Sequence, residues 1–380
     1  MSALYAHIPH TMYGDVRRLR VLAWAVVGVC LTRSLHYSLW GESIHFSQAQ
    51  YASSHARRFA RWLHNAQIHP QVWYWCLVRA VLQTWPAHLP LYLVLDTSVL
   101  PRGFILIRLS LIYRGRALPL TWRVIQHAST SVSYRAYRGL LYQACWLLPR
   151  GPRIVFLADR GFVQRPLFRF AYRQHWYWRV RLKGNTRVRL PDGRRTTVAA
   201  LCPPPGHAHF YHGVAVCGLS YGPLHLALAN PTTGEEPWYI LTPDPSTRAA
   251  LDDYALRFDI EEEFLDDKSG GFDAEHSELA DGPAWERLFL IVAVATLHFT
   301  CVGTAVLEAK TRRWVDTHWD RGLSYLQIGW RWLRQQFRKH WLVLPAFTLA
   351  PAPDPEPALA SRQAKTQAQR HWIVTTFSES

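Results

Sequence analysis

The sequence predicts an α/β fold: a mixed sheet flanked by helices, interrupted by a β-rich insertion and preceded by a helical N-terminal region. Three observations predict it. Short apolar runs of strand length alternate with stretches of helix length from residue 90 onward. Turn signals rich in Pro and Gly crowd residues 185–250. At 380 residues, 49% of them hydrophobic, the chain can bury a core for two domains, or for one domain with an insertion.

The first 88 residues read as mainly helical. An apolar run at residues 21–31 has arginines on both sides, and further arginines stand beside Trp62. Basic side chains interleaved with aromatic ones suit contact with a DNA backbone, although a solvated helix face carries the same residues about as often. We expect a helical, DNA-binding N-terminal domain over residues 1–88.

The second domain is expected over residues 89–345. Its first half follows the order β-β-β-α-β-α-β, and three strands in succession predict an antiparallel meander. The expected elements are strands at 91–95, 104–113, 117–125, 154–158 and 176–182, and helices at 134–148 and about 166–175. In this order Asp96 ends the first strand and Asp159 ends the fourth.

Residues 185–250 break this alternation. Turn signals such as Pro191-Asp192-Gly193 separate short apolar pieces, which predicts a small β-rich insertion. Its expected strands lie at 196–201, 210–216, 224–229 and 238–242. Helices are expected to resume after the insertion. Residues 346–380 have the composition of a flexible C-terminal tail.

The charge of the chain indicates an anionic partner. Lysine and arginine total 43 against 27 acidic residues, a net charge of +16, and nearly all of the positive charge is arginine. Arginine suits phosphate, so nucleic acid is the natural partner class, while an arginine-rich genome is the other explanation. The six cysteines form no CxxC and no zinc-type pairing, and no secretory signal is recognised. We therefore expect a cytoplasmic protein.

One stretch favours a membrane instead. Residues 288–307 carry no formal charge over 20 residues, about the length that spans a bilayer. Threonines and His298 interrupt the stretch. A core helix of a large α/β domain has the same pattern and is the preferred interpretation, with a single-span membrane protein as the alternative.

Acidic residues concentrate in one segment of this basic chain. Eight of them lie in residues 252–267, DDYALRFDIEEEFLDD. On a helix that turns about 100° per residue, one narrow stripe holds Tyr254, Arg257, Glu261 and Lys268, directly beside an apolar stripe. The segment therefore predicts a helix that presents one carboxylate together with two cations and a phenol.

The same helical geometry separates the three consecutive glutamates. Glu262 and Glu263 fall on the far side and are expected to be solvated, whereas Glu261 lies at the border of the core. Asp96 and Asp159 end strands that can be neighbours, so all three acids can meet at one end of the sheet. Mg²⁺-dependent phosphodiester cleavage uses two ions about 3.5–4 Å apart, held by such oxygen ligands. Taken singly, each acid is more often a turn, cap or surface residue, and only their joint appearance with the Tyr, Arg and Lys stripe favours a catalytic site.

The spacing Tyr-x2-Arg-x3-Glu-x6-Lys resembles the YREK signature of the insertion sequence four family of bacterial DDE transposases. VLDTS around Asp96 is similar to the family's first acidic motif, and FLADRGF around Asp159 to the second. HWDRGLSYLQIGW, residues 318–330, is similar to the region near the end of the family's catalytic domain. The resemblance covers about residues 90–340.

This resemblance implies an RNase H-like catalytic fold and Mg²⁺-dependent cut-and-paste DNA transposition. Asp96, Asp159 and Glu261 would bind two Mg²⁺, with Mn²⁺ as a substitute. Water would cut one strand at the element's end, and the freed 3′ hydroxyl would attack DNA, with a hairpin intermediate in relatives. The implied partners are double-stranded DNA, as terminal inverted repeats and target, and a second copy in a synaptic dimer, with no membrane. The implied location is the bacterial cytoplasm, at the nucleoid.

By the same resemblance, Tyr254, Arg257 and Lys268 would hold terminal phosphates, because arginine offers a bidentate fork and lysine a point charge. We also expect Arg160 and Lys183 to contact DNA.

Trp238, in WYILT at the last strand of the insertion, takes the position at which some relatives stack a flipped base. With 18 tryptophans in the chain, a core role is equally open. The alternative function is a catalytically inactive, transposase-derived protein that still binds DNA.

Overall fold

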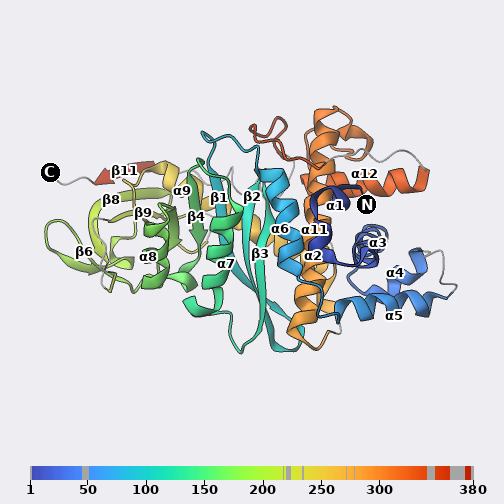
Figure 1. Cartoon of the computed structure of the whole chain (residues 1–380). Coiled ribbons are helices and arrows are strands. Elements are labelled where there is room, and N and C mark those ends of the chain that lie inside the picture. Colours follow the sequence, from blue (N-terminus) through green and yellow to red (C-terminus); the bar gives the residue numbers. More distant parts are fainter. Residues whose placement is uncertain are drawn as a thin grey trace.

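A single mixed sheet runs through the computed structural model, with helices on both of its faces and a group of helices at one end (Figure 1). The structure describes residues 2–44, 51–216, 218–219, 224–232, 235–270, 272–277, 279–339, 347–359 and 373–377. The predicted fold class, a mixed sheet flanked by helices with an insertion and a helical N-terminal region, is confirmed.

The first half of the sheet has the predicted meander and crossovers. Antiparallel pairing joins the first three strands, β1 (Leu91–Leu100), β2 (Phe104–Tyr113) and β3 (Arg116–Gln126). Helix α7 (Tyr134–Leu147) leads to β4 (Ile154–Ala158), parallel to β1, and α8 (Arg165–Arg173) leads to β5 (Tyr177–Arg181), parallel to β4. The resulting order, β3-β2-β1-β4-β5, is the RNase H-like arrangement that the resemblance implies.

The insertion extends this sheet instead of forming one of its own. Its strands are β6 (Arg187–Arg189), β7 (Arg195–Thr197), β8 (His207–Val216), β9 (Leu224–Ala229) and β10 (Trp238–Thr242). Because β10 pairs antiparallel with β5, the order continues as β5-β10-β9-β8-β6-β7. The strand predicted at 196–201 was wrong after Thr197, where a 3-10 turn over Ala199–Leu201 follows.

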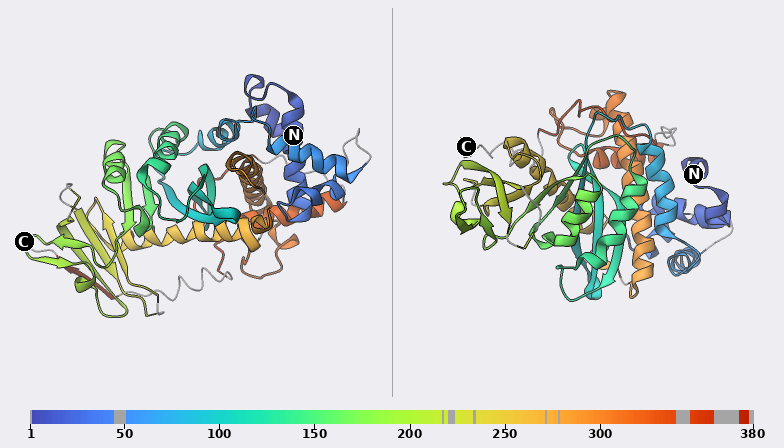
Figure 2. Two further views of the ribbon diagram at one scale, coloured as in Figure 1. Left: turned by 90° about the horizontal axis from the view of Figure 1, so that it is seen from below. Right: turned by 60° about the vertical axis from the view of Figure 1, so that its left-hand side comes forward.

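The two faces of the sheet carry different helices. On one face lie α6 (Pro70–Leu82), α7 and α8, and on the other α9 (Arg248–Ala255) and α10 (Asp259–Leu265) (Figure 2, left). Side chains on the strands agree with this: the Thr121 hydroxyl donates to the Leu140 carbonyl of α7 at 3.4 Å, whereas the Ser110 hydroxyl donates to Glu263 of α10 at 2.8 Å. Alternation along β2 and β3 therefore assigns each strand residue to one helical layer.

The N-terminal region is helical, as predicted. Its helices are α1 (Ser2–His7), α2 (His10–Tyr13), α3 (Val16–Thr32), α4 (Tyr37–Ser43), α5 (Ala52–Leu63) and α6. They share one hydrophobic core with the sheet and the C-terminal helices. The Trp330 indole, for example, donates to the Cys30 carbonyl at 2.8 Å, and Arg287 donates to the Leu63 carbonyl at 2.9 Å.

The long apolar stretch is a core helix in this structure. Helix α11 (Gly282–Glu308) is long and apolar enough to cross a membrane, yet 89% of its most apolar window is buried inside the protein. It packs against α12 (Tyr325–Lys339) at van der Waals distance, because a Cβ at Gly303 would lie 2.0 Å from the Tyr325 carbonyl oxygen. A side chain there would separate the two helices.

The expectation of a flexible tail was wrong for two stretches. Residues 347–359 pack on the sheet and on the segment before α12: Asp354 pairs with Arg321, and the Tyr113 hydroxyl donates to the Ala350 carbonyl at 3.3 Å. Residues 373–377 form β11 (Ile373–Phe377), parallel to β8. Buried arginine and an open sheet edge bind a segment whose composition alone is that of a linker.

Candidate active site

Asp96 lies in the interior of β1 and not at its end, which corrects the predicted strand boundary. The strand continues to Leu100, but its parallel pairing with β4 stops at the Leu95–Ala158 pair. Asp96 and Asp159 each follow this last pair, so the two acids stand next to each other across neighbouring strands. The prediction that these strands are neighbours is confirmed.

The Asp96 side chain points to the α10 face of the sheet. Its cross-strand partner on β2 is Arg108, whose guanidinium contacts α10, and directly opposed residues of an antiparallel pair share a face. One oxygen of Asp96 accepts from the Thr97 backbone N–H at 2.8 Å, and the other accepts from Arg257 at 3.2 Å.

Arg257 is the centre of the site. Its guanidinium, 6% exposed, donates to Asp96 at 3.2 Å and to Glu261, one turn later on α10, at 2.5 Å. Burial alone lowers the pKa of Arg257. Tyr254 and the carboxylates of Asp96, Glu261 and Asp159 raise this pKa by more, so the net shift is upward. The guanidinium is therefore a permanent cation within electrostatic reach of all three predicted catalytic acids.

Neighbouring groups shift the pKa of Asp96 in opposite directions. Burial raises the pKa of Asp96 to about 6; Arg257 and the Thr97 N–H lower it, and Asp159 and Glu261 raise it. Arg257 thus pairs directly with Asp96 and Glu261, and Asp159 follows the strand next to Asp96.

The three acids offer the type of ligand that a divalent metal requires. Carboxylate oxygens are the hard ligands that Mg²⁺ prefers, and a buried oxygen of Asp159, Oδ1, has no hydrogen-bond partner among the described residues. In the arrangement described, however, Arg257 lies between Asp96 and Glu261, and no group of three His, Cys, Asp or Glu side chains in the described residues is close enough to hold an ion. The three carboxylates are ligands of the type that Mg²⁺ prefers. In the described arrangement, Arg257 is the cation that pairs with two of them, Asp96 and Glu261.

The single helix expected over residues 254–268 was wrong. Helix α9 ends at Ala255, a 3-10 turn covers Leu256–Phe258, α10 ends at Leu265, and a π-helical turn occupies Asp266–Gly270. Lys268 lies in this last turn with φ −89° and ψ −119°, outside helical geometry. The Arg257–Glu261 pair keeps the predicted spacing of one turn, but Lys268 does not continue the stripe.

The acidic segment mainly neutralises arginines of the sheet. The expectation that Glu263 is solvated was wrong: its side chain is 4% exposed and accepts from Arg108 at 2.8 Å. Asp267 accepts from the same guanidinium at 2.6 Å, and Glu262 lies 3.3 Å from Arg116. The simple helical projection failed because the sheet packs against a second side of α10, where Arg108 requires counter-charges.

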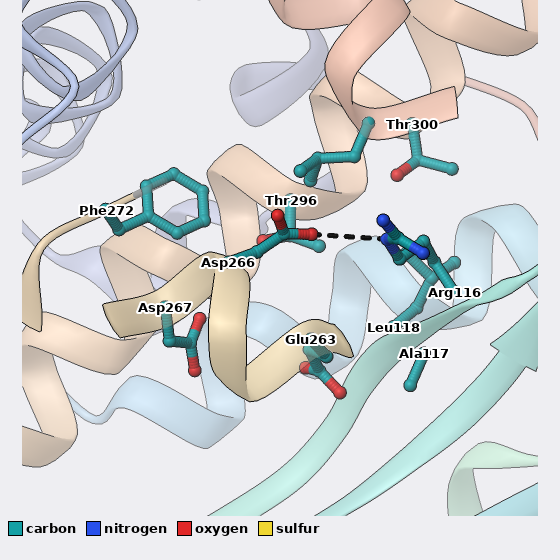
Figure 3. A pocket seen from close by; sticks show the side chains of 10 residues that line it. Arg116, Ala117, Leu118, Glu263, Asp266, Asp267, Phe272, Thr296 and Thr300 are labelled. Carbon is teal, nitrogen blue, oxygen red and sulfur yellow. Dashed lines mark ion pairs between the residues drawn. The ribbon is translucent and has the colours of Figure 1, made fainter. Parts of the chain in front are cut away.

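A small pocket lies beside this network. Its lining side chains come from β3, from the α10 segment, from α11 and from α12, and Asp266 points across it to Arg116, with 3.3 Å between Arg116 Nε and the carboxylate (Figure 3). Burial raises the pKa of Asp266 to about 6, although Arg116 lowers it. Asp266 is thus a buried acid that titrates near neutral pH.

This titration predicts a pH-dependent stability. Between about pH 4 and pH 6 the folded protein binds more protons at Asp266 than the unfolded chain, so the stability that this group contributes at low pH is lost as the pH rises through about 6. Asp266→Asn cannot titrate. We expect the free energy of unfolding of the parent to fall by about 2–3 kcal/mol relative to Asp266→Asn between pH 4 and pH 7. Urea unfolding at several pH values measures this difference.

Asp252→Asn is the matched control, because the Asp252 side chain is 64% exposed in the same acidic segment. Its difference from the parent should be flat across this pH range. A flat difference for Asp266→Asn as well would contradict the prediction.

Two of the predicted DNA contacts are buried. Tyr254 is 0% and Trp238 is 2% exposed, and their rings meet at 5.4 Å between centroids in a second hydrophobic cluster under the insertion. Burial raises the pKa of Tyr254 to about 12. Of the two roles left open for Trp238, the structure places it in the core, and neither ring is accessible to a base or a phosphate in this conformation.

Two further predicted contacts, Arg160 and Lys183, lie at the surface. Arg160, directly after Asp159, is 45% exposed and pairs with Glu236 at 3.0 Å, and Glu236 also accepts from Arg181 at 2.9 Å. Lys183 is exposed just after β5. Both cations precede the insertion; Arg160 follows β4 and Lys183 follows β5.

Sequence reasoning missed the buried arginines. Arg108 is 1% and Arg179 is 4% exposed, and each binds two carboxylates on the α9–α10 side. Arg179 donates to Asp244 at 2.8 Å and pairs with Asp253 at 3.0 Å. The available signal was a charged residue inside a predicted strand, which in a buried strand requires a partner of opposite charge.

Comparison with known proteins gave one kind of match. No family model matches the chain, and no curated protein matches it. Among solved structures, the chain is similar to the piggyBac transposase in the cryo-EM structure of its synaptic complex with hairpin DNA, with a TM-score of 0.41 and 12% identity, covering 90% of this chain and 78% of that one.

Proposed function

We propose that this chain is a DDE-type DNA transposase that cuts the ends of an insertion sequence and joins them to target DNA. The observation that supports it best is that Arg257 pairs with Asp96 and Glu261, while Asp96 and Asp159 each follow the last paired residues of β1 and β4. This set of acids, on two neighbouring parallel strands and a following helix, is the one that the YREK-type resemblance implies.

Asp96, Asp159 and Glu261 are the proposed ligands of two Mg²⁺ ions, for which Mn²⁺ can substitute. When bound, such ions supply an activated water and stabilise the leaving oxygen of the phosphodiester. The half-buried position of Asp96 limits competition from bulk water, and the buried Oδ1 of Asp159 has no hydrogen bond to give up. Glu261, 53% exposed, must exchange Arg257 for its new partner.

Arg257 is the proposed phosphate ligand of the chain. Its guanidinium neutralises Asp96 and Glu261 in the structure described, and the same fork binds a phosphate bidentately. Arg160, Lys183 and Lys268 are proposed to contact the DNA around it. We also propose membership of the insertion sequence four family, a hairpin intermediate, a synaptic dimer and action at the bacterial nucleoid.

The test uses the DNA that flanks the coding region. Duplexes carrying its inverted repeats, incubated with the purified protein and Mg²⁺, should be nicked at the repeat boundary, and EDTA should prevent nicking. Absence of nicking with both Mg²⁺ and Mn²⁺, at protein concentrations that shift the duplex in a gel, would overturn the enzymatic assignment.

A catalytically inactive, transposase-derived DNA-binding protein is the second candidate. It is favoured by one observation: within the described residues, no three potential ligands stand close enough together for an ion. Binding without cleavage in the same gel assay would select this candidate.

A further inference from the structure

The α7–α8 face is a second basic surface, on the side of the sheet away from α10. Between Asp96 and Asp192 the sequence has 18 lysines and arginines and one acid, Asp159. Three of these cations, Arg108, Arg116 and Arg179, pair with the acidic segment on the other face. Five exposed arginines stand on α7 and α8.

Each of the two helices presents one stripe of cations and aromatics. Positions 135, 138, 142 and 146 of α7, and 165, 169, 172 and 173 of α8, recur at helical spacing and are all exposed. The five cations of this surface, none with an ion pair or hydrogen bond to another described residue, are Arg135, Arg138, Arg165, Arg169 and Arg173. This is an electrostatic surface without its counter-charge in the part of the chain that the structure describes.

The two stripes lie side by side. Tyr142 of α7 contacts Phe170 of α8, with ring centroids 5.1 Å apart, and both helices stand on the same side of the sheet (Figures 1 and 2). Tyr142 and Trp146 are each 55% exposed, Tyr172 is 68% exposed, and Arg79 of α6 stacks over Trp146 at 4.6 Å. Large aromatic side chains left exposed among arginines are typical of a surface that contacts a partner.

The surface begins at the end of the sheet that carries Asp159. Helices α7 and α8 each precede a strand of the parallel set β1-β4-β5, so they run back along it, and their first turns lie at the end of the sheet that carries Asp159. Arg135 and Arg165 stand in those first turns. Helix α7, 14 residues long, extends about 21 Å from that edge.

From this placement we propose that the α7–α8 face binds the phosphodiester backbone of a segment of duplex DNA that continues beyond the active site. Duplex DNA carries one negative charge per about 1.7 Å of axis, so the face is long enough to meet several phosphates. The contacts are to phosphate and sugar and carry no sequence preference. The inference extends the proposed transposase function, because it assigns a track to DNA that the acids do not cut.

The test is the salt dependence of binding to a 30-base-pair duplex of arbitrary sequence. The variant Arg138→Gln/Arg169→Gln/Arg173→Gln should reduce the slope of log K against log salt concentration by about 2–3, since each lost phosphate contact contributes about 0.9. The control Arg187→Gln/Arg189→Gln/Arg195→Gln removes the same charge from exposed positions of β6 and β7 and should leave the slope within about 1 of the parent.

Equal slopes for the variant and the parent, or an equal reduction in the control, would overturn the proposal. Stronger loss of binding to anionic phospholipid vesicles than to duplex would assign the face to a membrane surface instead, and would also overturn it. Unfolding midpoints of both triple variants should match the parent, because all six side chains are exposed. The two failures are distinguishable. If the triple variant loses slope but the parent protein never nicks element ends, the DNA-binding role of this face stands and the transposase function is rejected.

Discussion

Asp159→Asn is expected to lower the rate of Mg²⁺-dependent DNA cleavage by at least about 10³-fold, equivalent to about 4 kcal/mol of transition-state stabilisation. The change keeps the shape of the side chain and removes the charge that a divalent ion requires. Asp96→Asn and Glu261→Gln should have losses of the same order. Single-turnover cleavage of a duplex that carries the element's end measures all three.

The fold and the binding step should survive these changes. Asp159 is half-buried, and its Oδ1 has no hydrogen-bond partner among the described residues, so the amide replaces no existing contact. Removal of a negative charge beside the DNA should leave affinity for the duplex equal or increased. Asp252→Asn, in an exposed side chain of the acidic segment, is the control and should cleave at the rate of the parent.

If Asp159→Asn cleaved DNA at the rate of the parent, Asp159 would have no role in the reaction. The same outcome for all three acids would reject the metal site. Loss of cleavage together with a lowered unfolding midpoint would instead indicate a structural defect, and Asp159→Glu, which keeps the charge, then provides the comparison: the transposase assignment requires its metal affinity to exceed that of Asp159→Asn.

Arg108→Met is expected to destabilise the protein by about 3–5 kcal/mol, the largest effect of a single substitution on stability that we expect from this structure. Arg108 is 1% exposed and is the shared partner of Glu263 and Asp267, at 2.8 and 2.6 Å. Without it, two buried carboxylates face each other with no cation between them. Urea unfolding at pH 8 measures the effect.

The cost should depend on pH, because the two acids can become neutral. Burial raises the pKa of both Glu263 and Asp267, while Arg108 lowers them. Without Arg108 each acid takes up a proton more readily, so the destabilisation should be smaller at pH 5 than at pH 8. Adding Glu263→Gln and Asp267→Asn to Arg108→Met should recover most of the loss.

Arg123→Met is the matched control. Arg123 is an exposed arginine on the neighbouring strand β3 whose contact is to the Ala136 carbonyl at 3.2 Å, and its loss should cost no more than about 0.5 kcal/mol. A similar small cost for Arg108→Met would show that the buried network adds little to stability.

Much of the sheet could be predicted from sequence because its strands are apolar and buried on both faces. The runs at Ile154–Ala158, Leu224–Ala229 and Trp238–Thr242 have the predicted bounds, and turns rich in Pro and Gly delimit them. The crossover helices followed in the same way. Periodicity did not indicate that the insertion continues the main sheet, because the pairing of β10 with β5 joins segments that are far apart in sequence.

The candidate site was predicted in its members and not in its contacts. Asp96 and Asp159 follow neighbouring strands, and Arg257 and Glu261 lie one helical turn apart, because alignment of parallel strands and helical spacing are local rules. The convergence of the three acids on a metal site stays a prediction. The predictions for Trp238 and for the solvated side of α10 were wrong. Burial depends on which surface packs against an element, and that surface comes from elsewhere in the chain.

The sequence by itself determined the strands, the crossover helices, the excess of positive charge and the spacing of the acids, because each follows from neighbours within a few residues. Tertiary structure alone decided that most acids of residues 252–267 neutralise buried arginines, and that Arg257 stands between Asp96 and Glu261. It alone also decided which arginines remain exposed on α7 and α8. The physical reason is that the energy of a charge depends on its burial and on its partners, and both are set by segments distant in sequence.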